Sequence, residues 1–175
     1  MGRELRRVPP NWDHPKSERG EYRPLYDQTF AEAFLEWLDD FDRVRCGEMT
    51  DFERECYPSF GEWCADHHPP DPKYYVPYTS EQATWFQIFE TVSEGTPVTP
   101  PFATKAELVE YLVRHGDFWQ QKRWNEGNHF MQPNPPGYSR ESAEAFVEQG
   151  WAPSMVISNG KLAMGIDVPL ALKSE

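Results

Sequence analysis

The cysteine and histidine residues are the first candidates for chemistry in this 175-residue chain. Cys64 and His67 form a C-x-x-H step, and Cys56 precedes them as a possible third ligand. Zinc needs such ligands to converge at about 2.0–2.3 Å, and the spacing lacks the paired C-x-x-C steps of zinc ribbons. Because three cysteines are an odd number and nothing indicates secretion, we expect reduced thiols, no metal and no other cofactor.

The sequence contains none of the common nucleophile, phosphate-binding or metalloprotease motifs, such as G-x-S-x-G, the P-loop or H-E-x-x-H. A general acid–base pair can be assembled from Glu94 and His129, but a chain with 29 acidic residues contains many such pairs by chance. We therefore expect a protein that is not an enzyme. A small hydrolase-like enzyme is the third of three hypotheses.

The loop from Glu90 to Thr99, with the sequence ETVSEGTPVT, gathers hydroxyl groups, a carboxylate and backbone N–H groups. Loops on rigid scaffolds often carry binding sites, although a tight turn whose side chains bind its own backbone explains the same residues. As a nucleotide site, the loop would need a stacking tryptophan and nearby arginines. The residues assigned to this site are Trp85, Glu90, Ser93, Glu94, Gly95, Thr96, Arg114 and Arg140.

Negative charge is concentrated in one stretch of the chain. The whole sequence carries 17 basic and 29 acidic residues, a net charge of -12, and residues 25–71 alone carry thirteen acidic and three basic groups, a balance of -10. Direct nucleic-acid binding relies on a basic footprint, so this composition argues against it. No apolar run approaches the roughly 20 residues that a membrane helix needs, and we expect a protein without a membrane partner that resides in the cytoplasm.

Carboxylates between residues 32 and 42 would lie along one face of a helix. A helix rises about 1.5 Å per residue and B-DNA carries one charge per roughly 1.7 Å, so such a row approximates a row of phosphates. It would attract a protein that holds nucleic acid with Lys and Arg; a solvated face that maintains solubility is the alternative. The residues assigned to partner binding are Glu32, Glu36, Asp39, Asp40 and Asp42, with Trp63 as an exposed aromatic anchor.

The first part of the chain must position these carboxylates. Residues 1–24 contain four prolines and are predicted to form an extended N-terminal arm. Apolar residues then recur every three or four positions, which predicts a helix over 28–45 with Asp27 as its N-cap. Residues 48–56 are predicted to form a short acidic helix, and the proline-rich stretch 67–78 a loop.

The rest of the chain alternates strand and helix signals. The pattern predicts a strand over 84–92, a helix opened by the capping box at Thr104 and closed at Gly116, and a second helix between Ser139 and Gly150. A loop with Trp119, Trp124, Asn128 and His129 is expected between those helices. Asn159-Gly160 predicts a type I′ turn joining strands 152–158 and 161–168.

These elements predict an α+β fold with a small antiparallel sheet and about three helices. The extended arm, residues 1–24, is expected to precede a single domain over 25–175. Within that domain, 25–71 is the acidic helical part and 84–170 is the core.

The stretch from Trp85 to Leu112, WFQIFETVSEGTPVTPPFATKAELVEYL, resembles the core of a family of small bacteriophage and prophage proteins without an assigned activity. Members read W-E-T-x-S-E-G-x-P-x-S-P-x-F before an amphipathic helix; here the tryptophan–glutamate step is Phe89-Glu90, and Thr99 replaces serine. Residues 139–156 and 6–15 are also similar. The resemblance implies phage origin and expression in a bacterial cytoplasm, and implies no activity.

Three hypotheses follow. The first is a phage-encoded, non-enzymatic anti-defence inhibitor that binds a host nucleic-acid-handling immune protein, of the CRISPR or restriction type, through a DNA-mimic-like acidic surface. That step relies on analogy with other small acidic phage proteins. The second is a binder that sequesters a nucleotide immune signal in the 90–99 loop, and the third is the enzyme with Glu94 and His129.

Overall fold

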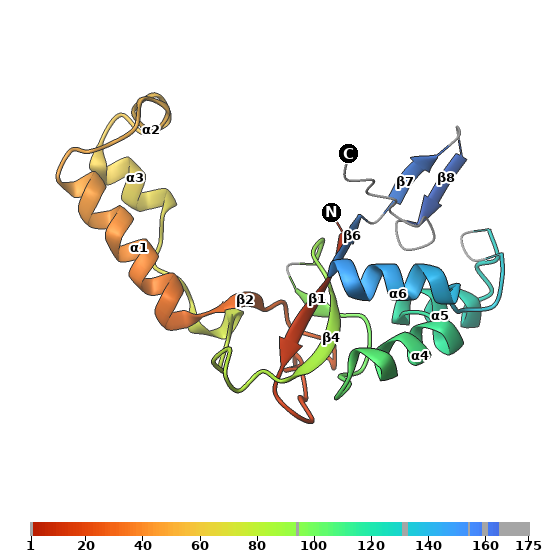
Figure 1. Cartoon of the computed structure of the whole chain (residues 1–175). Helices are drawn as coiled ribbons and strands as arrows, with labels where there is room; N and C mark the ends of the chain where they lie inside the picture. The colour runs from red at the N-terminus through yellow and green to blue at the C-terminus, as the bar shows by residue number, and fades with distance from the viewer. Residues whose placement is uncertain (1, 94, 131–132, 154, 159–160, 165–175) are drawn as a thin grey trace, which may run out of the picture. The chain divides into compact units, whose positions relative to one another are not determined.

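The computed structural model describes residues 2–93, 95–130, 133–153, 155–158 and 161–164 (Figure 1). The chain divides into two compact units: Met1–Pro24 with Tyr78–Glu175, here called the sheet unit, and Leu25–Pro77, here called the acidic unit. The backbone therefore passes between the units twice, at residues 24–25 and at residues 77–78.

A four-stranded antiparallel sheet forms the centre of the sheet unit. Its strands are β1 (Gly2–Val8), β4 (Trp85–Glu90), β5 (Thr96–Pro97) and β6 (Trp151–Pro153), in the spatial order β5-β4-β1-β6. In the register of β1 with β4, Leu5 lies opposite Ile88 and Arg3 lies opposite Glu90. A separate two-stranded pair, β7 (Met155–Ser158) and β8 (Lys161–Met164), is also antiparallel.

Three helices cover one face of this sheet: α4 (Lys105–His115), α5 (Phe118–Asn125) and α6 (Arg140–Gln149). Figure 1 shows them gathered on one side of β1 and β4. The core between them is built from Ile88 of β4 and from apolar residues of both long helices, among them Leu108, Leu112 and Phe146, which are at most 3 % exposed. Alternation along the strand sends Ile88 towards these helices and Phe89 towards the opposite face.

Local capping signals set the helix ends where the sequence predicts them. Thr104 accepts a hydrogen bond from the Glu107 N–H while the Glu107 carboxylate accepts one from the Thr104 N–H, which is the predicted capping box. Ser139 caps α6, and Gly150 ends it in the left-handed conformation, with φ of 80°.

A buried ion pair joins the first strand to the helical layer. Arg3 Nε lies 2.7 Å from Asp117 Oδ2, and the two side chains are 2 % and 0 % exposed. Asp117 is also the N-cap of α5, since its Oδ1 accepts a hydrogen bond of 2.9 Å from the Gln120 N–H, and its Oδ2 accepts one of 2.8 Å from the Tyr138 hydroxyl. Burial is the largest single effect on the pKa of Arg3 and lowers it, but Asp117 and the other nearby acidic groups together outweigh it. The pKa of Arg3 is therefore raised, with Asp117 as the main cause.

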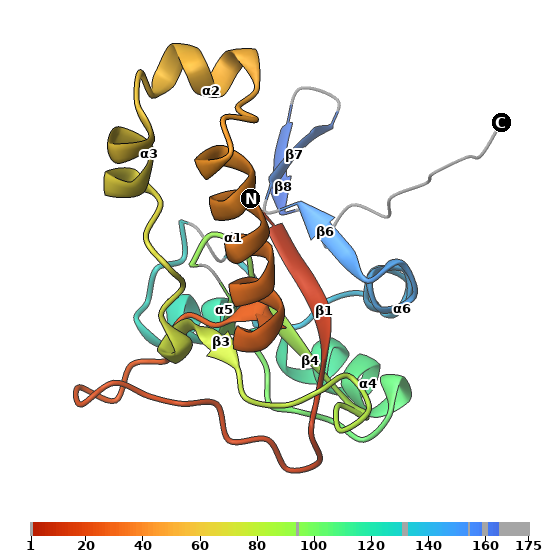
Figure 2. The ribbon, with the colours of Figure 1, turned by 90° about the vertical axis from the view of Figure 1, so that its left-hand side faces the viewer.

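The acidic unit is mainly helical. It contains β2 (Tyr26–Thr29), α1 (Phe30–Arg45), α2 (Asp51–Cys56), α3 (Phe60–Asp66), the 3-10 helix η1 (Pro72–Tyr74) and β3 (Tyr75–Val76), which pairs in parallel with β2. Figure 2 shows α2 connecting α1 to α3, which runs beside α1. Within the described part of the chain, no helix combines the length and the apolar character needed to cross a membrane.

The predicted α+β class is confirmed, as are the strand at 85–90 and the helices at 30–45, 51–56, 105–115 and 140–149. The predicted pairing of strands around Asn159-Gly160 is present at β7 and β8, while the two turn residues lie outside the described residues. The N-cap of the first helix is Thr29 rather than Asp27, because Thr29 forms a capping box with Glu32.

Two expectations are wrong. Residues 2–8 are not part of an arm: they form a strand between β4 and β6, with Arg3 paired to Asp117. The expected count of about three helices is too low, because the described residues form six α-helices, including α3 and α5. Helix α5 replaces a predicted loop because Asp117 caps its first turn, although its sequence shows little helical periodicity.

The Arg3–Asp117 pair predicts a large cost for removing one partner. In Arg3→Leu, the Asp117 carboxylate would stay buried without its cation, and we expect the free energy of unfolding to fall by about 3–5 kcal/mol. Urea denaturation followed by tryptophan fluorescence measures this change. The control is Arg7→Leu, at an exposed position near the end of the same strand, expected to stay within about 0.5 kcal/mol of the wild type; equal losses in both variants would contradict the prediction.

Candidate protein-interaction surface

One stripe of helix α1 is aromatic and only partly covered by the rest of the acidic unit. The rings of Phe30, Phe34, Trp37 and Phe41 follow each other along this face, with centroids 5.7, 5.7 and 5.1 Å apart. Trp37 also donates a hydrogen bond of 3.0 Å from its indole N–H to the carbonyl of His67. Tilted ring contacts along one stripe therefore fix which way the other faces of α1 point.

A second face of α1 combines leucine and aspartate. Leu35, Leu38, Asp39 and Asp42 follow the i, i+3, i+4, i+7 spacing of one helical stripe. Leu35 is 65 % exposed and Leu38 is 37 % exposed, so this stripe presents two adjacent apolar side chains to water. We call this stripe, together with the neighbouring Glu36, the Leu–Asp face.

The basic groups of the acidic unit are all engaged inside it. The unit carries thirteen acidic and four basic side chains, a balance of -9. Arg43 binds Asp40 and Glu53, and Arg45 lies 3.0 Å from Asp42. The remaining two, Arg54 and Lys73, pair with Asp51 and Asp71. No cation of the unit is left to neutralise its other carboxylates within the described chain.

The exposed carboxylates fall into two groups. Glu32 closes the capping box of Thr29, and the hydrogen bonds from Thr29 lower its pKa. Glu36 and Asp39, by contrast, form no ion pair or side-chain hydrogen bond with any residue that the structure describes. These two carboxylates border Leu35 and Leu38, so the Leu–Asp face offers both negative charge and apolar area.

One charged contact joins α1 to α2. Both terminal nitrogens of Arg43 in α1 donate to the Glu53 carboxylate of α2, at 2.9 and 2.7 Å, and Arg43 also donates to the carbonyl of Glu48 at 2.8 Å. The bidentate geometry and the hydrogen bonds from Thr50 lower the pKa of Glu53 to about 2. Arg43 correspondingly has a raised pKa.

The structure separates the residues predicted to bind a partner. Glu36 and Asp39 remain available, whereas Glu32 caps the helix and Asp40 and Asp42 pair with Arg43 and Arg45. Leu35 is not among the predicted residues, because it lies outside the main apolar stripe. Its i, i+3 spacing to Leu38 and i, i+4 spacing to Asp39 were the signal that could have identified it.

The assignment of Trp63 as an exposed anchor is wrong. Trp63 is 2 % exposed, because its ring lies parallel to that of His67, with centroids 4.4 Å apart, and to that of Phe60 at 6.4 Å. Phe41 of α1 packs on it as well. Trp63 therefore belongs to the core of the acidic unit.

Several residues proposed for a nucleotide site already have partners within the sheet unit. Trp85 and Glu90 occupy opposite ends of β4. The Gly95 N–H donates to the Glu90 carbonyl at 3.1 Å, and the hydroxyls of Ser93 and Thr96 contact each other. The Glu90 carboxylate accepts a hydrogen bond of 3.1 Å from the Trp119 indole N–H. Glu94 lies outside the described residues.

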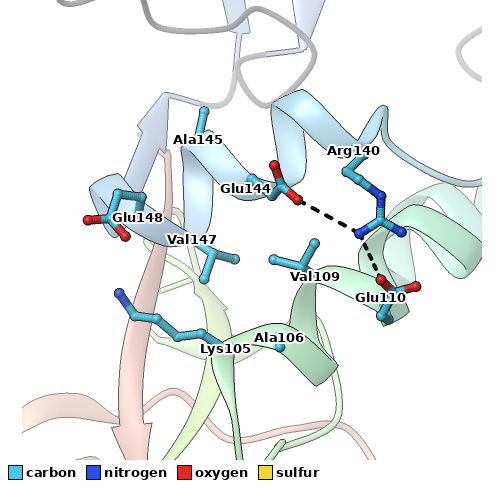
Figure 3. A pocket seen from close by; sticks show the side chains of 9 residues that line it. All are labelled: Lys105, Ala106, Val109, Glu110, Arg140, Glu144, Ala145, Val147 and Glu148. Atoms are coloured by element: carbon cyan, nitrogen blue, oxygen red, sulfur yellow. Dashed lines mark ion pairs between the residues drawn. The ribbon is translucent and has the colours of Figure 1, made fainter.

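The two arginines assigned to that site lie elsewhere, on α4 and α6. Arg140 binds Glu110 at 2.7 Å and Glu144 at 3.8 Å, and Arg114 lies 3.8 Å from Glu110. Figure 3 shows Arg140 reaching towards both carboxylates at one end of a groove between the two helices. The groove measures about 570 Å³, and its apolar lining consists of Ala106, Val109, Ala145 and Val147.

The described residues contain no cluster of three or more His, Cys, Asp and Glu side chains placed to hold a metal ion. Cys56 is exposed and Cys64 is half-buried, and both are unpaired thiols. The Nδ1 atom of His67 lies 3.0 Å from the carbonyl of Trp63. Of the suggested acid–base pair, only His129 is described; its ring meets that of Trp124 edge-on at 4.9 Å.

The Glu53 carboxylate predicts how acid acts on the acidic unit. The pKa of Glu53 is about 2 in the folded protein against an ordinary value of 4.5, so its stabilising effect is complete above pH 4.5 and is lost between pH 4.5 and 2. An acid titration of helical circular dichroism should show this loss in the wild type. In Glu53→Gln the helical signal should be lower at pH 7 and fall less over that range. Equal losses of helical signal between pH 4.5 and 2 in the two proteins would contradict the prediction.

Comparison with protein-family models, with curated proteins and with solved structures finds no match to this chain. We therefore infer its function from the charge, exposure and contacts described above.

Proposed function

We propose that the protein is a non-enzymatic binding protein whose Leu–Asp face docks onto a positively charged surface of another protein. The observation that carries this proposal is the juxtaposition of two unpaired carboxylates, Glu36 and Asp39, with the exposed Leu35 and Leu38 on one helix. Interfaces of this kind combine apolar anchors, which supply affinity, with charges that steer encounter and fix orientation. A single helical stripe suits the mode in which an amphipathic helix enters a groove.

Charge favours a partner of a different kind over a second copy of this chain. Two acidic units, each with a balance of -9, would repel one another on approach. A basic surface would instead be attracted, and the attraction would weaken as salt screens it. The partner is therefore a protein with a cationic patch beside an apolar groove.

Proteins that handle nucleic acid are the class most often equipped with such a patch, because they hold phosphates with Lys and Arg. The resemblance of residues 85–112 to a family of phage proteins implies that the protein acts in the cytoplasm of a bacterial host. We accordingly propose a host immune protein as the partner and anti-defence inhibition in the bacterial cytoplasm as the role, with the carboxylates of α1 competing for the phosphate-binding surface. No contact in the described residues favours the nucleotide-binding or enzymatic alternatives.

Charge reversal tests the surface directly. The double variant Glu36→Lys/Asp39→Lys should lose the proteins that the wild type captures from a nuclease-treated bacterial lysate, as quantified by mass spectrometry. The matched control is Glu18→Lys/Glu21→Lys, which changes the net charge equally, with the same spacing, at exposed positions of the sheet unit. Capture by the control but not by the α1 variant supports the proposal, and equal capture by both variants contradicts it.

Removal of the apolar anchor should weaken the same complex without changing charge. Leu35→Ser deletes the most exposed leucine of the face, and we expect the affinity for a captured partner to fall by about tenfold or more, as for an interface hot spot. Titration calorimetry with the purified partner measures this change. Because Leu35 contributes little to the core, the melting temperature should stay close to the wild-type value; unchanged affinity would exclude Leu35 from the interface.

A further inference from the structure

His14 is buried in the sheet unit although it belongs to the proline-rich segment 9–24. It is 4 % exposed, and its ring meets Tyr22 edge-on and Phe89 of β4 at a tilt, with both centroids 5.6 Å away. Segment 9–24 thus covers the face of the sheet opposite the helices, and His14 is the residue it inserts there.

Both ring nitrogens of His14 have partners. The indole N–H of Trp12 lies 3.4 Å from Nδ1, and Nε2 lies 2.7 Å from the carbonyl oxygen of Arg23. An indole nitrogen can only donate and a carbonyl can only accept, so Nδ1 is the acceptor and Nε2 carries the proton. The arrangement fits the neutral imidazole in a single tautomer.

The two partners of His14 contact the points where the chain leaves the sheet unit and where it returns to it. Arg23 precedes Pro24, the last residue before the first crossing, and Trp12 packs edge-on against Tyr78, the first residue after the second crossing, at 4.9 Å. Hydrogen bonds from the Arg23 N–H to Pro15 and from the Ser17 N–H to Glu21, at 2.9 and 2.8 Å, close a small loop beside His14. Trp12 and His14 therefore anchor both crossings within the sheet unit.

The surroundings of His14 disfavour its charged form. Burial is the main cause of its lowered pKa; the Arg23 carbonyl opposes this, Arg6 of β1 adds to it, and Asp13 opposes it. Arg6 stacks on Phe89 with its Cζ 4.8 Å from the ring centroid and binds Glu4, while Lys16 lies over Tyr22. On β4 the side chain facing His14 is the uncharged Phe89.

We propose that His14 is a proton-sensitive anchor: uptake of one proton at Nδ1 breaks the Trp12–His14 hydrogen bond, and the charged ring then leaves its buried site, which frees the Arg23 carbonyl and releases both crossings from the sheet unit. A proton on Nδ1 would place two N–H donors against each other at the Trp12 contact. It would also leave an imidazolium between aromatic rings and close to Arg6. The closed state thus favours the neutral form, independently of what the Leu–Asp face binds.

The direction of the pH dependence follows from linkage. The open state binds a proton at the ordinary histidine pKa of 6.5 and the closed state only at lower pH. The anchor is therefore fully stable above pH 6.5 and weakens as the pH falls from 6.5 towards the lowered pKa.

Amide hydrogen exchange of the full-length protein tests the His14 anchor. Between pH 7.5 and 5, after correction for intrinsic exchange rates, we expect protection of the Arg23 and Ser17 amides to fall by about tenfold per pH unit below pH 6.5, the slope for one proton. The Gly116 and Gly150 amides, which bond to Leu112 and Phe146, serve as internal references and should show no such slope.

Two variants and one spectroscopic signal show whether His14 causes the pH dependence of amide protection. In His14→Gln the slope should disappear, whereas His115→Gln, at an exposed histidine, should keep it. Should His14→Gln lose protection already at pH 7.5, the imidazole ¹⁵N shifts of the wild type decide: Arg23 protection must fall as His14 titrates. Protection that persists after His14 is protonated, or a slope retained in a folded His14→Gln, would overturn the proposal.

Discussion

The buried ion pair between Arg3 and Asp117 is the contact on which the sheet unit depends. It links the first strand to the N-terminus of α5 across most of the sequence, at 2.7 Å and almost without exposure to water. An unpaired buried charge costs several kcal/mol, so β1 can occupy the middle of the sheet only when α5 is formed and Asp117 faces Arg3. The helix cap and the Tyr138 hydrogen bond make the same carboxylate part of the helical layer.

The acidic unit follows the opposite principle, because its charges are exposed and most of its ion pairs lie at the surface. Such pairs stabilise little, with the bidentate Arg43–Glu53 contact as the best-formed exception. Their consequence is electrostatic: they consume every cation of the unit and leave Glu36 and Asp39 uncompensated next to Leu35. A basic partner with an apolar groove would meet the uncompensated charge and the exposed leucine of this helix at once.

Local signals were enough to predict most helices, because a capping box such as Thr104–Glu107 and an apolar stripe such as that of α1 are complete within a few residues. Strand β1 was not predictable in this way: its sequence GRELRRV reads as polar until β4 and Asp117 are known to surround it. The same holds for the site. The acidic character of α1 is visible in the sequence, but which carboxylates are paired depends on Arg43, Arg45 and Glu53, and the burial of Trp63 depends on the packing of α3 against α1.

Carboxyl footprinting of the complex shows whether the Leu–Asp face contacts the partner. Once a partner has been captured, the side chains of the bound and unbound protein are labelled with a carbodiimide and an amine, and the extent of labelling is read for each carboxylate by mass spectrometry. We expect Glu36 and Asp39 to become protected in the complex while Glu18 and Glu21 are labelled as before. Equal labelling of Glu36 and Asp39 in the bound and unbound protein would show that the partner binds elsewhere, and would contradict the assignment of the Leu–Asp face.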